Sequence, residues 1–203
     1  MERVHNFIAK FINIIFHPLC MITYLMVFFL YCNKFFYYIF PSNIKHIVLG
    51  FIVVTTIIIP LLCYLMLKYF KIFNNVNIKT QRLLILIFFS IIVFFTARSL
   101  AKIGLPYTII RFLFFNSALL LVLSPVTLIS DINFSAIGIG ELIGVYTCWM
   151  RYLIADNIYI FVFLLLIFGL IGFSQIYLKK AKPLNYCLET LIGMFFAIFA
   201  ILF

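Results

Sequence analysis

Long apolar stretches separated by short polar joints run through almost the whole of this sequence. Only 10% of its 203 residues are charged and 67% are hydrophobic, whereas a soluble domain carries about a quarter charged residues. One soluble core could not bury so much apolar surface, so we expect the surrounding solvent to be lipid. This composition argues against an ordinary soluble enzyme or binding domain.

The length of the apolar stretches predicts helices that cross a membrane, because a span needs about 20 apolar residues for a hydrocarbon core roughly 30 Å thick. Arg98, Lys102 and Arg111 interrupt the third and fourth stretches, so the alternative to seven spans is six with a re-entrant or interfacial helix. We predict an all-α, polytopic transmembrane helix bundle of six to seven spans, forming one integral membrane domain over residues 1–203. The candidate spans are Leu19–Phe36, Ile47–Met66, Leu83–Leu100, Tyr107–Leu128, Phe134–Met150, Ile158–Leu178 and Leu184–Phe203.

The first residues are predicted to form an amphipathic helix along the membrane surface over Asn6–Phe16, before His17-Pro18 turns the chain inward. No small-x-small cleavage site follows, so we do not expect this segment to be a cleaved signal. The apolar residues that recur at helical spacing are Phe7, Ile8, Phe11, Ile12 and Ile15.

The net charge of +10 resides at the ends of the predicted spans, which is typical of topological anchors and not of a nucleic-acid surface. With the N-terminus in the cytoplasm, nine Lys and Arg fall on that side and six on the other, which favours this orientation. The five cysteines are widely spaced in apolar runs, and the three histidines show no ligand spacing with them. We therefore expect no metal, no cofactor, no disulfide framework and no nucleic-acid partner.

Two segments differ from generic membrane helix. In Asp131–Gly144, Asn133 and Ser135 precede a glycine-rich run, and in Gly172–Asn185, Ser174-Gln175 precedes a cluster of lysines. Together they resemble the second and third motifs of the type 2 phosphatidic acid phosphatase superfamily, in the compact membrane form of Bacteroidetes-like bacteria. The resemblance covers nearly the whole chain in layout. It implies a membrane phosphatidic acid phosphatase-like fold in a bacterial cytoplasmic (inner) membrane.

The resemblance also implies a chemistry whose reactive groups this chain lacks. In the superfamily, cations bind the phosphate, a third-motif His attacks phosphorus and a second-motif His protonates the leaving oxygen. Here the two histidine positions fall on Ala181 and Ser135, and the third-motif Arg falls on Gln175. No catalytic residue is carried over. The former phosphate site would comprise Lys79, Arg82, Asn133, Ser135, Ser174, Gln175 and Asn185.

We therefore expect a pseudoenzyme that binds lipid headgroups or serves as a structural membrane subunit, with membrane lipids and other membrane proteins as partners. One alternative is an active lipid or undecaprenyl-diphosphate phosphatase with a rearranged site. Another is a small transporter or an accessory subunit of a membrane complex. The sequence indicates no oligomeric state.

Glu141 and Glu189 fall inside predicted spans, where a lone carboxylate costs several kcal/mol. One expectation is that each acid hydrogen-bonds a neighbouring helix or lies close to the membrane interface. The alternative is that the acids pair with Lys79, Arg82 or a nearby lysine, in place of the charge of a bound phosphate. Gly140-x3-Gly144 predicts a close contact between two helices, because small residues let helix backbones approach in lipid.

Overall fold

The computed structural model describes residues 2–32, 41–69, 76–152 and 158–202, and these are helical almost throughout. The chain forms two compact units. Unit 1 combines Met1–Ile39 with Asn133–Phe203, and unit 2 is Phe40–Ile132. The prediction of a single domain stays a prediction, whereas the all-helical architecture is confirmed over the described residues.

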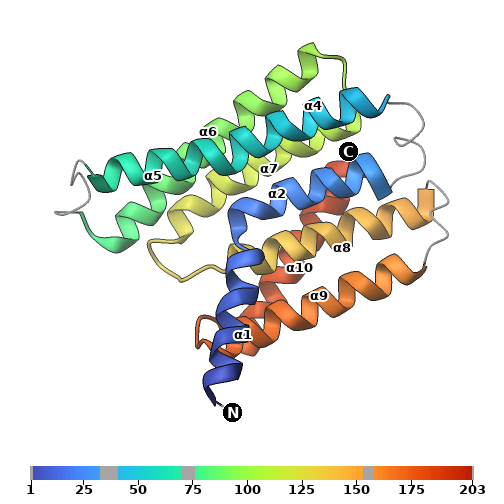
Figure 1. The fold of residues 1–203 in the computed structure, drawn as a ribbon. Coiled ribbons are helices and arrows are strands. Elements are labelled where there is room, and N and C mark those ends of the chain that lie inside the picture. Colours follow the sequence, from blue (N-terminus) through green and yellow to red (C-terminus); the bar gives the residue numbers. More distant parts are fainter. Residues whose placement is uncertain (1, 33–40, 70–75, 153–157, 203) are drawn as a thin grey trace. The chain divides into compact units, whose positions relative to one another are not determined.

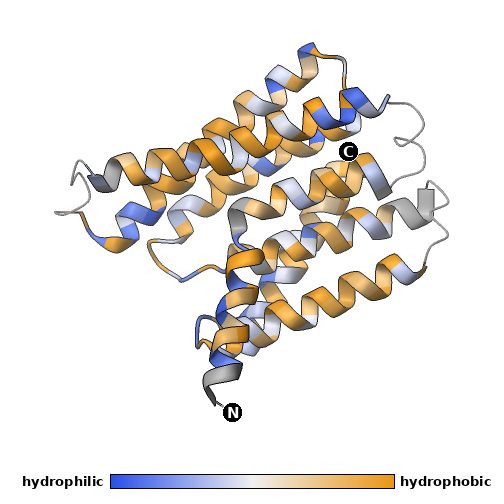
Figure 2. Cartoon of the chain, in the orientation of Figure 1, coloured by the Kyte–Doolittle hydropathy of each residue, from blue (hydrophilic) through white to orange (hydrophobic). Residues whose placement is uncertain are grey.

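Unit 2 is built from long apolar helices (Figure 1). α4 (Ser42–Val53), the π-helical turn η2 (Val54–Ile58) and α5 (Ile59–Tyr69) follow one another without a break. α6 (Ile78–Lys102) and α7 (Tyr107–Val126) pack together as a pair. The helix surfaces are mostly hydrophobic and the hydrophilic residues gather near helix ends, as expected of helices that face lipid (Figure 2).

The π-helical turn has a local cause in the sequence. Pro60 has no backbone N–H, and its ring would clash with the carbonyl group one turn earlier in a regular α-helix. The hydroxyls of Thr55 and Thr56 donate hydrogen bonds to the carbonyl oxygens of Phe51 and Ile52 at 2.8–3.1 Å. The side chains thus satisfy backbone groups within the helix, as an apolar surrounding requires.

Reciprocal serine contacts join α6 to α7. Ser90 Oγ donates to the carbonyl oxygen of Ser117 at 2.8 Å, and Ser117 Oγ donates to the carbonyl oxygen of Ser90 at 3.0 Å. Both side chains are buried. Small hydroxyl residues therefore allow a close approach and supply hydrogen bonds between the two helices.

In unit 1, the helices α8 (Phe134–Tyr152) and α10 (Pro183–Leu202) pack closely against each other. An alanine Cβ at Gly140 would strike the carbonyl oxygen of Thr190, and one at Gly193 would strike the carbonyl oxygen of Ile137. Gly144 likewise faces Met194. The predicted close contact at Gly140-x3-Gly144 is confirmed. The helical elements of unit 1 are α1 (Glu2–Ile15), α2 (Pro18–Val27), the π-helical η1 (Phe28–Cys32), α8 (Phe134–Tyr152), α9 (Ile158–Tyr177) and α10 (Pro183–Leu202).

Among the described residues, five helices are long and apolar enough to cross a membrane: Ser42–Met66, Ile78–Lys102, Tyr107–Val126, Ile158–Tyr177 and Pro183–Leu202. The count rises to six if the bent pair His5–Ile15 and Cys20–Tyr31 forms one span. Five or six such helices in the described residues are consistent with a helical membrane bundle, and the number of spans, six to seven, stays a prediction. The predicted span Phe134–Met150 lies within α8, of which Phe134–Cys148 is an apolar stretch. The end of the predicted span Leu19–Phe36 lies outside the described residues.

Candidate functional site

The residues of the predicted phosphate site are divided between the two units. Lys79 and Arg82 lie in the first turns of α6 in unit 2. The other five belong to unit 1, where they occupy the start of α8, the end of α9 and the start of α10: Asn133, Ser135, Ser174, Gln175 and Asn185.

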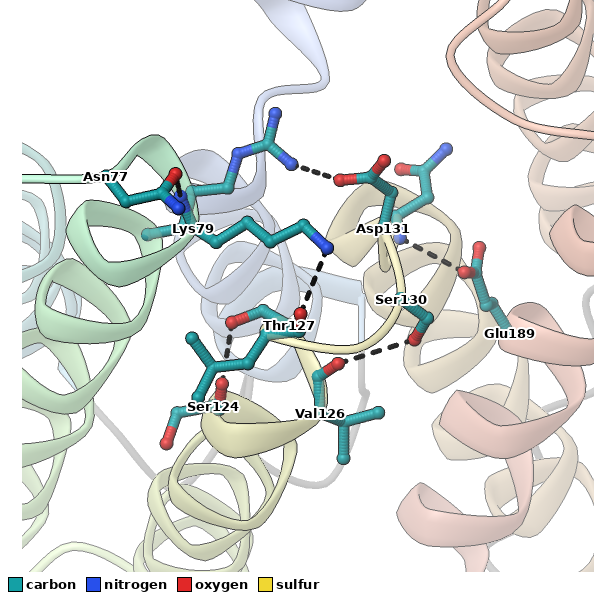
Figure 3. A network of polar contacts seen from close by, with 11 residues as sticks. Asn77, Lys79, Ser124, Val126, Thr127, Ser130, Asp131 and Glu189 are labelled. Carbon is teal, nitrogen blue, oxygen red and sulfur yellow. Dashed lines mark hydrogen bonds and ion pairs between the residues drawn. The ribbon is translucent and has the colours of Figure 1, made fainter.

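In unit 2, both cations already have partners within the chain. Arg82 forms an ion pair with Asp131, and Lys79 Nζ donates a hydrogen bond to the carbonyl oxygen of Leu128 at 3.0 Å (Figure 3). Asn77 precedes α6 and its side-chain oxygen accepts from the backbone N–H of Lys79 at 3.4 Å. The two cations thus link the start of α6 to the segment that follows α7, through one ion pair and one hydrogen bond.

We expect Arg82→Ala to change the stability of the protein little. The Arg82 and Asp131 side chains are 55% and 73% exposed, and exposed ion pairs contribute about 0–1 kcal/mol. Thermal unfolding in detergent should show a small shift that vanishes at high salt. Asp131→Asn should give the same small shift, whereas a large loss in either variant would show that this pair holds the helices together.

In unit 1, the third-motif positions are bonded to the N-terminal helix. Ser174 Oγ donates to the carbonyl oxygen of Ala9 at 2.7 Å, and Gln175 Nε2 donates to Asn13 Oδ1 at 2.8 Å. Ser174 and Gln175 are both buried. Gln175 therefore makes the hydrogen bond between helices that its position in an apolar segment predicts, and its partner lies on α1.

Of the two residues matched to the second motif, Ser135 is bonded to the corner between α1 and α2. Ser135 Oγ donates to the carbonyl oxygen of Phe16 at 2.8 Å. Asn133 Oδ1 accepts from the backbone N–H of Ser135 at 3.1 Å, which satisfies a free donor at the start of α8. Asn133 thus caps a helix, and the hydroxyl of Ser135 is used to hold the N-terminal segment.

The two hydroxyls do not converge on one point. The carbonyl groups that accept from Ser174 and Ser135 belong to Ala9 and Phe16, seven residues apart, or about 10 Å along a helix. A bound phosphate group would need donors that meet within a few ångströms of one another. These side chains instead line the N-terminal segment along its length.

The turn between α9 and α10 contains the residues that the resemblance matches to the end of the third motif. The backbone N–H groups of Lys180 and Ala181 both donate to the carbonyl oxygen of Gln175, at 2.9 and 3.3 Å. Lys179 adopts the left-handed conformation, with φ of 53°. Asn185 is exposed in the first turn of α10. At position 181 the turn carries only the methyl group of an alanine, Ala181.

Sequence reasoning placed no histidine at this site, but the structure brings two to this end of unit 1. The rings of His5 and Tyr177 lie with centroids 6.5 Å apart. Desolvation, with a further contribution from the charge of Lys180, lowers the pKa of His17 below its usual value. His17 follows Phe16, the partner of Ser135. Its charged form is thus disfavoured, in part by the charge of Lys180.

One of the two acids in the predicted spans, Glu189, makes a hydrogen bond within unit 1. Glu189 Oε1 accepts from the backbone N–H of Asn133 at 3.2 Å, so this acid contacts a neighbouring segment and not a lysine. Glu189 Oε2 and Asn133 Nδ2 are buried without a hydrogen-bond partner. Glu141 is buried two turns into α8. The bond to a neighbouring segment is therefore the correct alternative for Glu189.

The fold defines an all-helical protein with several helices of membrane-spanning length and composition. No protein family, curated protein or solved structure matches this chain. Within the described residues, no group of three His, Cys, Asp or Glu side chains is placed to hold a metal ion.

Proposed function

We propose that this protein is a non-catalytic membrane protein with a phosphatidic acid phosphatase-like fold, which binds lipid headgroups or serves as a structural membrane subunit. One observation carries the proposal: Ser135, Ser174 and Gln175, at positions where relatives would bind phosphate, donate to the N-terminal segment. Donors used in this way are not directed at a substrate.

The chemistry of position 181 supports the same proposal. Phosphoryl transfer through a covalent intermediate needs a side chain with a lone pair, and Ala181 has none. A rearranged phosphatase would have to use His5 or His17, which lie at this end of unit 1. The active phosphatase is therefore the second candidate, and His17 beside Lys180 is the feature that favours it.

Purified full-length protein in detergent and lipid is expected to release no phosphate from phosphatidate, phosphatidylglycerophosphate or undecaprenyl diphosphate. The physical reason is the missing nucleophile, without which the covalent route is closed. Inorganic phosphate would be measured over time against a sample without protein, with an active lipid phosphatase as the positive control.

The variants Ser135→Ala, Lys79→Ala and His17→Ala decide what any turnover would mean. Phosphate release that these substitutions abolish would establish the active phosphatase and overturn the proposal. Release that survives all three would show that phosphate is handled elsewhere in the molecule, and that the site is wrongly placed.

A further inference from the structure

The N-terminal helix α1 packs on the rest of unit 1 through small and polar residues, while its large apolar side chains are exposed. Its small and polar residues Ala9 and Asn13 face α9, where they accept hydrogen bonds from Ser174 and Gln175. Its large apolar side chains point away, with Phe7 71% and Ile14 70% exposed. A helix in water would do the opposite. The apolar face of α1 therefore requires a hydrocarbon surrounding.

The angle of α1 suits the surface of a membrane. The axes of His5–Ile15 and Cys20–Tyr31 are bent by 68° from one another. If the second segment enters the bilayer, the first lies closer to the membrane plane than to its normal. Figure 1 shows α1 crossing the end of α9 instead of following its length. An amphipathic helix in this position buries its apolar face at the boundary between headgroups and acyl chains.

Four lysines lie at the same end of unit 1. Lys179, Lys180 and Lys182 occupy the turn directly after α9, where α1 is bonded, and Lys10 lies on α1 itself. All four side chains are exposed. The lowered pKa of His17 reflects in part the positive charge of Lys180. The lysines of the turn therefore lie at the end of α9 to which α1 is hydrogen-bonded.

The chain offers few carboxylates that could neutralise these lysines. The sequence contains no Asp or Glu between Glu2 and Asp131, and none between Asp156 and Glu189. α1, the end of α9 and the turn after it therefore have no acidic residue of their own beyond Glu2. Counter-charge for the lysines has to come from outside these segments, and anionic lipids attract cations at the membrane surface.

We propose that the apolar face of α1 and the four lysines form one binding surface for an anionic phospholipid. The acyl chains would lie against Phe7, Phe11 and Ile14, and the phosphate would lie against the lysine ammonium groups. The inference deepens the lipid-binding part of the proposed function. Measured phosphate release would contradict the proposed absence of catalysis but not the proposed binding surface. Equal binding of anionic and zwitterionic phospholipid would contradict the binding surface alone.

The test uses the full-length protein in zwitterionic detergent micelles, titrated with phosphatidylglycerol or with phosphatidylcholine. Wild-type protein is expected to bind phosphatidylglycerol more tightly, with the difference shrinking as salt is added. Each lysine near a membrane surface contributes about fivefold in affinity, so Lys180→Gln with Lys182→Gln should weaken phosphatidylglycerol binding about 30-fold. Bound lipid would be counted by native mass spectrometry.

The matched control is Arg98→Gln with Lys102→Gln, which removes the same formal charge from two exposed residues of α6. It should leave the affinity for phosphatidylglycerol near the wild-type value, as should Lys180→Arg with Lys182→Arg. Equal weakening by the control pair, or no weakening by the lysine-to-glutamine pair, would overturn the proposal.

Two further arms test the source of the anion and the role of the apolar face. Phe7→Asn with Phe11→Asn should weaken binding of both lipids, because the acyl chains lose their contact. Inorganic phosphate at the same concentration should not displace phosphatidylglycerol. Displacement by phosphate, or unchanged lipid binding after the phenylalanine substitutions, would show a simple anion site and not a lipid surface.

Discussion

Gly140→Ala is expected to destabilise the protein severely, because a single added methyl group has nowhere to go. Its Cβ would strike the carbonyl oxygen of Thr190 and lie 3.1 Å from the backbone nitrogen of Met194. Both belong to the backbone of α10, which cannot move aside as a flexible side chain can. Overpacking usually costs about 1–3 kcal/mol, and we expect a loss at or above the upper end of that range. Thermal unfolding in detergent and the yield of monodisperse protein would measure it.

The chain supplies a matched control for this substitution. Gly169 lies in α9, and a Cβ there would meet nothing within 4 Å. Gly169→Ala should leave stability unchanged or raise it by about 0.5–1 kcal/mol, since glycine is costly inside a helix. Gly193→Ala should behave like Gly140→Ala, because its Cβ would strike the carbonyl oxygen of Ile137. Similar unfolding temperatures for Gly140→Ala and Gly169→Ala would contradict the tight crossing.

The length of apolar stretches predicts the long helices well, because a span is set by the thickness of the hydrocarbon core. The predicted span Ile158–Leu178 ends one residue beyond α9, and Tyr107–Leu128 ends two residues beyond α7. The predicted span Phe134–Met150 also lies within a helix, α8, but its residues from Ser135 to Tyr146 are buried throughout, so this apolar helix packs against protein instead of lipid. Composition alone does not separate these two kinds of apolar helix.

The polar residues of the candidate site show a different limit. A buried amide or hydroxyl in an apolar segment must find a partner, so hydrogen bonds for Ser174 and Gln175 were predictable. Which partner they find was not, because Ala9 and Asn13 lie 165 and 162 residues away in the chain. Asn13 was the available signal, since it is a polar residue within an apolar run of an amphipathic helix.

The hydrogen-bond partners of Ser135, Ser174 and Gln175 indicate what these side chains do in this chain. In the phosphatase superfamily that the sequence resembles, side chains at these positions act on a bound phosphate. The contacts of this chain give three of those positions a role in holding its own N-terminal segment. The same contacts leave the apolar face of α1 directed outward.

Ser174→Ala combined with Gln175→Ala is expected to release α1 from α9 while the remaining helices stay folded. The double variant removes two hydrogen bonds from buried side chains and leaves Asn13 without its partner. Such losses cost about 1–3 kcal/mol, and each 1.4 kcal/mol corresponds to about a tenfold change in a local opening equilibrium. Backbone amides of Asn6–Ile15 should therefore exchange hydrogen about ten- to a hundredfold faster, as measured by mass spectrometry.

Ser90→Ala combined with Ser117→Ala is the control, because it removes buried hydroxyl contacts of similar length between α6 and α7. It should speed exchange in those helices and leave α1 unchanged.

A double-mutant cycle of Asn13→Ala and Gln175→Ala should give a coupling energy of about 0.5–2 kcal/mol. If α1 exchanges at the same rate in both double variants and the coupling is zero, lipid contact alone holds the helix. The contacts of Ser174 and Gln175 would then lend no support to the proposed absence of catalysis. That proposal would rest on Ala181 alone.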